Sequence, residues 1–112
     1  MIKNIENGMT IYFYRSLDSH VIRGVIKDSS LQDAEFDNVK IIKFVDWKGL
    51  IDHEGKEIRP LGGTSGVCLD RAFLTAKETN DAKKAEVEKR KDELRKEITD
   101  LESLFKFLLS IA

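Results

Sequence analysis

A run of three glycines and two hydroxyl residues is the part of the sequence whose composition best suits phosphate binding. It occupies residues 61–66, LGGTSG, and backbone amides in such a run can form a concave anion-binding nest. No lysine follows the run and the spacing of a dinucleotide-binding loop is missing, so neither established phosphate motif is present. The alternative is a flexible loop between two strands. We take Gly62, Gly63, Thr64 and Ser65 as candidate phosphate contacts.

Other residue types that carry enzyme or metal chemistry are sparse. The single cysteine, Cys68, needs a histidine base or an electropositive setting to act as a nucleophile, and the only histidines are His20 and His53. In a strand, Cys68 would alternate with Val67 and Leu69, which is typical of a small buried hydrophobic residue. Two histidines 33 positions apart and one cysteine provide no metal-ligand pair at the usual spacing. We therefore expect no catalytic residue, no metal and no cofactor.

The charge balance and the hydropathy of the sequence disfavour two classes of partner, nonspecifically bound nucleic acid and membranes. Of the 112 residues, 41% are hydrophobic and 35% charged, which suits one small core with a highly charged surface. Residues 1–75 carry ten basic and eleven acidic side chains and residues 76–112 carry nine of each, so the field that drives nonspecific nucleic-acid binding is missing. The sequence shows neither a signal-peptide pattern nor the ~18 apolar residues of a membrane span. We expect a cytoplasmic protein with no membrane partner, which a single cysteine also fits.

Residues 1–74 have the composition and period of a small β domain. Aromatic and β-branched runs predict strands at 9–15, 20–28, 39–47, 50–53 and 66–69. Turn residues separate these runs at 16–19, 28–30, 37–38 and 54–55. The segment LIDHEGKEI, residues 50–58, predicts a hairpin, because Gly55 can take a positive φ at its turn. Short strands at this spacing predict a small antiparallel sheet or an SH3-like barrel, with Ile11 and Phe13 in the core.

From Thr75 onward the period changes to that of a helix. Thr75 and Glu78 form a capping-box pattern, and the residues that follow are strong helix formers without a proline or glycine. From Leu94 the apolar residues recur at spacings of 4, 3, 4 and 3, which is the a/d pattern of a coiled coil. Upstream the same seam meets polar residues such as Lys91 and Lys84, so it is weaker there.

A helix over residues 76–111 is too long to lie within the domain. It would measure about 54 Å, whereas a globule of 75 residues is about 25–30 Å across. The far end, LESLFKFLLSIA, is the most apolar part, and soluble proteins avoid exposing such a patch. Either the helix kinks near residues 80–81 and folds back, or several chains join their helices, in a bundle of more than two if need be. The heptad register favours the second, with these interface residues in the oligomerisation segment 75–112: Val87, Leu94, Ile98, Leu101, Leu104, Phe105, Leu108 and Ile111.

Three segments occur in a familiar order: ENGMTIYFYRS, which contains the first predicted strand, then HVIRGVIKD, and finally FLTAKETNDAKK at the start of the helix. They resemble small phage and prophage proteins of low-GC bacteria, in which a short barrel ends in a phrase close to vFlTkeEA and a C-terminal helix follows. Phe73, Leu74, Thr75, Lys77 and Glu78 match this phrase, whereas the next two residues depart from its acid–alanine pair. The resemblance implies a non-enzymatic accessory protein in the host cytoplasm and assigns no functional residue.

These features predict a non-enzymatic binding protein that works as a homo-oligomer. For a viral protein, the target would be a host defence protein or a small nucleotide signal held in a cleft between subunits. With the glycine run, the phosphate contacts would be the basic residues near the junction of sheet and helix: Arg71, Lys77, Lys83 and Lys84. The alternative is a small β-barrel regulator that stacks nucleic-acid bases on Trp47 and on Tyr12 or Tyr14.

Overall fold

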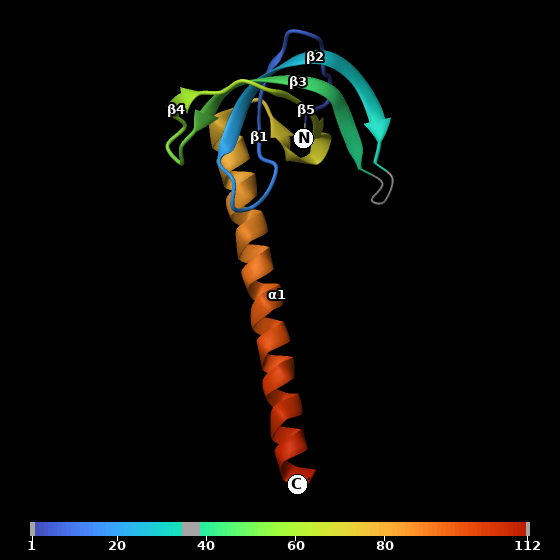
Figure 1. The fold of residues 1–112 in the computed structure, drawn as a ribbon, viewed down its shortest axis with the longest axis vertical. Helices are drawn as coiled ribbons and strands as arrows, with labels where there is room; N and C mark the ends of the chain where they lie inside the picture. The colour runs from blue at the N-terminus through green and yellow to red at the C-terminus, as the bar shows by residue number, and fades with distance from the viewer. Residues whose placement is uncertain (1, 35–38, 112) are drawn as a thin grey trace.

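A computed structural model describes residues 2–34 and 39–111 as a β-sheet followed by one long helix (Figure 1). The elements in chain order are β1 (Thr10–Phe13), β2 (Val21–Asp33), β3 (Lys40–Ile51), β4 (Glu57–Pro60), β5 (Thr64–Cys68), the 3-10 turn η1 (Leu69–Arg71), β6 (Ala72–Phe73) and α1 (Ala76–Ile111). This arrangement confirms the α+β class and the predicted order of an antiparallel sheet and a C-terminal helix. The turn predicted at 37–38 lies outside the described residues.

The sheet is antiparallel, with the strand order β4-β3-β2-β1-β6 and with β5 also paired to β3. Since β2 takes one edge of β3, β4 and β5 share the other edge, β4 at Gly49–Ile51 and β5 between Ile41 and Asp46. Only η1 separates β5 from β6, yet the described residues contain no pairing between these two strands. The two residues of β6 pair with β1 instead. The sheet is therefore open, and the closure that an SH3-like barrel requires is not formed.

The core is built by the long central strands, which arch over the start of the helix (Figure 1). Its buried residues are Ile2, Ile11, Phe13, Ile22, Ile26, Ile42, Val45, Val67 and Ala72, which confirms Ile11 and Phe13 as core residues. Register shifts in the β2–β3 pairing mark the bends. At one of them, Gly24 leaves no room for a side chain, because a Cβ there would lie 2.6 Å from Val45 Cγ1.

Two predicted boundaries were wrong, each for a local reason. Residues 28–30 lie inside β2 rather than in a turn. The side chains of Asn7 and Asp28 accept hydrogen bonds from the Ser29 and Ser30 amides at this irregular point of the ladder. The predicted strand 50–53 is the end of β3, which stops at Ile51. It leads through a turn at Gly55 (φ 85°) into β4, so the hairpin predicted at residues 50–58 is confirmed. All of β4 is exposed, so it lacks the alternation that marks a half-buried strand.

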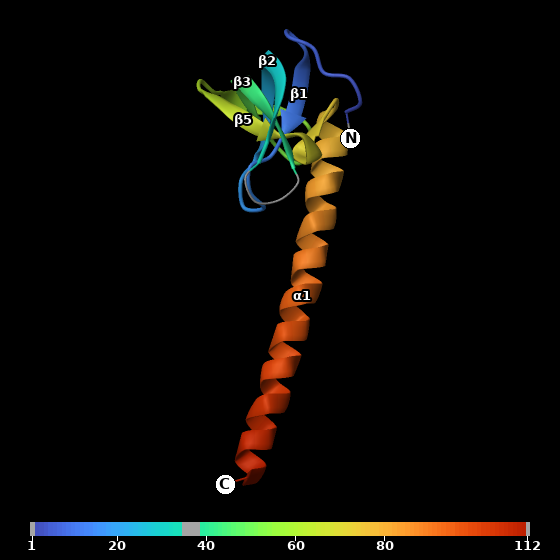
Figure 2. The same cartoon turned by 90° about the vertical axis from the view of Figure 1, so that its right-hand side faces the viewer.

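The helix α1 is continuous over 36 residues and projects far beyond the sheet (Figures 1 and 2). Thr75 Oγ1 accepts a hydrogen bond from the Glu78 amide at 3.1 Å, as the capping box predicted. The Glu78 carboxylate accepts from the Thr75 hydroxyl at 3.0 Å rather than from the Thr75 amide. The molecule measures 65 × 32 × 23 Å. The prediction that a helix of this length must project is confirmed, and the alternative of a kink at residues 80–81 was wrong.

Candidate functional site

The first turns of α1 are fixed to the sheet by buried polar contacts. Thr79 is fully buried, and its hydroxyl oxygen lies 2.8 Å from the carbonyl of Thr75 and 3.3 Å from that of Tyr12 in β1. Asn80 donates from Nδ2 to the carbonyls of Asp52 and His53, at 3.1 and 3.5 Å. The helix start is therefore attached both to β1 and to the turn that follows β3.

Nearly two turns further along the helix, a cluster of four residues sets the direction in which the helix leaves the sheet. The Tyr14 hydroxyl donates to the Glu86 carboxylate. Arg71 donates to Glu86 Oε2 at 3.0 Å and to the Arg15 carbonyl at 2.8 Å, and its guanidinium lies 5.1 Å from the centre of the Tyr14 ring. Burial raises the pKa of Tyr14, and the Glu86 carboxylate raises it further. Tyr14 therefore stays protonated and able to donate.

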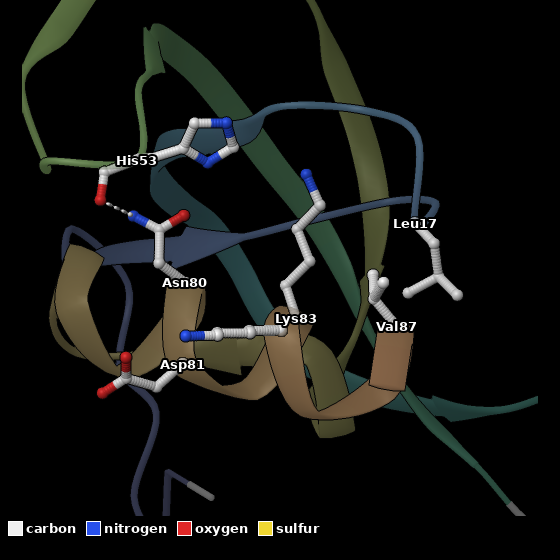
Figure 3. Close-up of a pocket in the computed structure, with 7 residues that line it drawn as sticks. Leu17, His53, Asn80, Asp81, Lys83 and Val87 are labelled. Carbon is white, nitrogen blue, oxygen red and sulfur yellow. Dashed lines mark hydrogen bonds between the residues drawn. The ribbon is translucent and has the colours of Figure 1, made fainter. Parts of the chain in front are cut away.

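A hollow of about 480 Å³ lies beside this attachment, at the junction of helix and sheet (Figure 3). The residues that line this junction hollow are Leu17, His53, Asn80, Asp81, Lys83, Lys84 and Val87. Lys83 donates to the Ser19 carbonyl, and the Asp81 carboxylate lies 3.6 Å from the ammonium group of Lys77. Lys84 has no hydrogen-bond or ion-pair partner among the described residues. Two ammonium groups and one imidazole against a single carboxylate make the hollow suitable for an anionic group.

The glycine run lies elsewhere, along the edge of β3 between β4 and β5. The Gly63 carbonyl accepts from the Trp47 amide at 2.9 Å, and Ser65 Oγ accepts from Trp47 Nε1 at 3.0 Å. The Thr64 hydroxyl donates to the Asp46 carboxylate at 2.9 Å, which places a negative charge beside the predicted phosphate contacts. The run, Gly62 included, leads into the edge strand β5 and does not line the junction hollow.

The predicted basic residues divide between two places. Lys83 and Lys84 line the junction hollow together, and Lys77 lines a smaller hollow beside it. Arg71 instead belongs to the cluster with Glu86, so the structure does not bring all four basic residues together. The sequence interpretation missed four of the lining residues, Leu17, His53, Asn80 and Asp81, and assigned Val87 only to the oligomer interface. No local signal marks them, because only the fold brings the turn after β3 against the helix.

Three residues weighed for catalysis or base stacking have settings that the sequence did not reveal. Cys68 is exposed and free, so the expectation of a buried cysteine was wrong. Tyr14 is only 2% exposed, and its hydroxyl is engaged. The guanidinium of Arg15 stacks over the Trp47 ring, 5.2 Å from the ring centre, and Gly63 packs against the same ring. A base could not reach Tyr14 without moving the helix.

The distal part of the helix carries most of the predicted interface residues, and it is exposed throughout residues 88–110. Six of these residues are between 41% and 65% exposed: Leu94, Ile98, Leu101, Leu104, Phe105 and Leu108. Phe107 and Leu109 add to the same apolar end, each 60% exposed. Val87 is half-buried at the junction hollow, and the side chain of Ile111 lies outside the described part of the structure.

Among residues 2–34 and 39–111, no three His, Cys, Asp or Glu side chains lie together as a metal site would need. Within the same residues, no helix has the length and apolar character to cross a membrane. Comparison of the chain with protein-family profiles, curated proteins and solved structures found no match.

Proposed function

We propose that this protein is a non-enzymatic binding protein that works as an oligomer, with residues 88–111 joining the subunits in a coiled coil or bundle. The observation that carries this proposal is the exposed apolar end of a projecting helix, where eight large side chains are at least 41% exposed. A contiguous exposed patch of this kind marks an interaction site. A helix without tertiary contacts is also only marginally stable in water. Pairing with a second copy of the chain would both cover the apolar patch and stabilise the helix.

The ligand site that fits this proposal best is the junction hollow rather than the glycine run. Its volume of about 480 Å³ lies in the range of small-molecule sites. Lys83, Lys84 and His53 would contact an anionic group such as the phosphate of a nucleotide, while Leu17 and Val87 give apolar surface. For a protein that resembles phage proteins, sequestration of a host nucleotide signal is a fitting role. Inhibition of a host defence protein is the other target class.

Native mass spectrometry of the untagged protein tests both parts. We expect a dimer or larger species that carries the extra mass of a bound nucleotide or gains it on addition of nucleoside phosphates. The Lys83→Ala, Lys84→Ala double variant should keep the oligomer and lose this added mass, whereas Lys96→Ala, on the exposed helix surface, should behave as wild type. A bare monomer would contradict the oligomer. An oligomer whose nucleotide binding is unchanged in the double variant would contradict the site.

A further inference from the structure

We infer that the distal segments, residues 88–111, pair antiparallel with those of a second copy, so that the end of each helix lies beside the partner's sheet. This inference rests on the self-association proposed above and adds a direction and a register. Three features of the described residues support it: the side of the helix that bears the apolar seam, the charges that flank the seam, and the length of helix left uncovered by the sheet.

The apolar seam continues the face on which the helix contacts the sheet. Asn80, Val87, Leu94, Leu101 and Leu108 form one row with a spacing of seven residues. A straight helix turns such a row by only about 20° per heptad. Its first two members line the junction hollow, so the distal members face the same side of the helix, where Figure 2 shows the sheet.

This placement disfavours a parallel dimer on steric grounds. Helices in contact lie about 8–10 Å apart, and two parallel copies would bring both sheets to the same level between their helices. The molecule is 23 Å wide even along its shortest axis, which is too wide for that space. An antiparallel pair puts the two sheets at opposite ends and leaves the seam of each helix free to meet the other.

The charges beside the seam also favour antiparallel pairing, independently of the steric argument. With Leu94, Leu101 and Leu108 at position d, the charged residues of the distal segment at position e are Glu88, Arg95 and Glu102, and those at position g are Arg90 and Glu97. In a parallel pair, g faces the e position that follows on the partner, so Arg90 would meet the partner's Arg95. In the same way, Glu97 would meet the partner's Glu102, again a pair of like charges.

In an antiparallel pair, e faces e. Arg95 can then meet the partner's Glu102, and the symmetry of the dimer makes this contact twice. Charges at e and g set the orientation of coiled-coil helices, so this pattern favours the antiparallel pair.

The contact between Arg95 and the partner's Glu102 also fixes a register. It sets Ile98 opposite the partner's Leu101 and Leu94 opposite the partner's Phe105. Residue 88 then faces residue 111 of the partner subunit, so the overlap covers residues 88–111. This overlap begins where the contact between helix and sheet ends, because residues 88–110 are exposed throughout.

Neighbouring registers fit less well. A shift of one heptad toward the sheets sets Arg95 against the partner's Arg95 and pushes the partner helix into the sheet. A shift of one heptad the other way sets Glu102 against the partner's Glu102. Both shifts therefore place like charges at the position where the proposed register places opposite ones.

The same arrangement explains why the apolar surface widens toward the far end. Leu104, Phe107 and Leu109 lie beyond a two-stranded seam, and each is at least 52% exposed. Antiparallel pairing sets them beside residues 90–95 of the partner helix, under the partner's sheet. There the side chain of Leu17 lines the junction hollow (Figure 3). Leu17 also lines a second hollow along the helix, with Glu86, Lys89, Arg90 and Glu93. The wide end therefore lies close to the apolar side chain of Leu17, a contact that a seam between helices alone would not offer.

Charge reversal at position 95 distinguishes the two directions, because they predict opposite signs. Arg95→Glu turns two attractive contacts into repulsive ones in the antiparallel pair, and the dimer Kd measured by sedimentation equilibrium should rise about three- to tenfold. In a parallel pair, the same change removes repulsion from Arg90 and the Kd should fall. Lys96→Glu, at the outward position f, controls for the charge and helix propensity. Restoration of the wild-type Kd by Arg95→Glu combined with Glu102→Arg would support the pairing, and a Kd below wild type in either variant would overturn it.

A distance measurement keeps the inference testable if the charge variants fold poorly. Spin labels on Lys89→Cys in a Cys68→Ser background should lie about 32 Å apart along the helix axis in the antiparallel pair, and side by side in a parallel one. Labels on Ser103→Cys should be only about 10 Å apart along the axis, which serves as the control. A dimer with a short distance at position 89 would overturn the antiparallel direction while leaving self-association intact. A monomer at all accessible concentrations would instead overturn the proposed function.

Discussion

Replacement of Glu86 by alanine tests whether the cluster around Tyr14 holds the helix to the sheet. Glu86 is the only described residue that accepts a hydrogen bond from the Tyr14 hydroxyl, and it also pairs with Arg71. Both partners come from the sheet part, 72 and 15 positions earlier in the chain. Loss of this one carboxylate therefore removes two contacts that join the two parts of the protein.

The expected loss of stability follows from the burial of each partner. Tyr14 is 2% exposed, so its hydroxyl would be left buried without an acceptor, which costs about 1–3 kcal/mol. The side chains of Arg71 and Glu86 are 32% and 37% exposed, so their ion pair contributes only ~0–1 kcal/mol. Alanine returns a few tenths through its helix propensity. We expect Glu86→Ala to lower the free energy of unfolding by about 2 kcal/mol, and Glu86→Gln, which keeps an acceptor for Tyr14, by about half as much.

Urea unfolding followed by circular dichroism measures this change, at one fixed protein concentration because association adds to apparent stability. The matched control is Glu93→Ala, which removes a carboxylate from an exposed pair with Arg90 (3.3 Å) and should change stability by no more than ~0.5 kcal/mol. A double-mutant cycle with Tyr14→Phe should show coupling of about 1 kcal/mol. Equal effects of Glu86→Ala and Glu93→Ala, or no coupling to Tyr14, would refute the role given to the cluster.

Two further predictions concern pH and backbone conformation. Because the folded state raises the pKa of Tyr14 above the ordinary value of about 10, its contribution to stability is present below that pH and is lost as the pH rises beyond it. The urea midpoint of the wild type should therefore drop between pH 9 and pH 11 more steeply than that of Tyr14→Phe, and parallel curves would contradict this. Gly63 has a φ of 134° and a Cβ there would lie 2.9 Å from the Trp47 ring, so Gly63→Ala should cost about 1–3 kcal/mol. Gly62→Ala, with nothing within 4 Å, should be nearly neutral, and equal thermal melting of the two variants would argue against this account.

The sequence was sufficient for the features that depend on local chemistry. The capping box at Thr75 and Glu78, the length of the helix and the core positions of Ile11 and Phe13 follow from residue type and period, and the structure confirms them. The turn residues around Gly55 also indicate the hairpin at residues 50–58, but the residues of its second arm do not by themselves mark the edge strand β4. Its four residues are all exposed, and only their pairing with β3 makes them a strand.

The candidate site was predictable only in part, because its walls come from distant segments. Lys83 and Lys84 stand near the predicted junction, and the structure places both in the hollow. His53 reaches the hollow only because Asn80 binds the carbonyls of the turn after β3. For the glycine run, local composition was misleading, because it suggested a phosphate-binding loop. Trp47 and Asp46 instead hold it in the edge strand, through contacts that no local pattern reveals.

The heptad row of α1 shows why a single period can serve two kinds of contact. In the sequence, the row is apolar at Leu94, Leu101 and Leu108 and mixed at Asn80 and Val87. From the sequence alone, this pattern indicates a coiled coil whose seam is weaker toward the start of the helix. The structure divides the row at residue 88, where the contact with the sheet ends. Before residue 88 the row faces the rim of the hollow and the carbonyl of Asp52, to which the polar side chain of Asn80 donates a hydrogen bond. After residue 88 the row faces solvent in the single chain, and apolar side chains in this part are what pairing with a second helix requires. The change in polarity therefore coincides with the point where contact with the chain's own sheet ends and the proposed contact with a second copy begins.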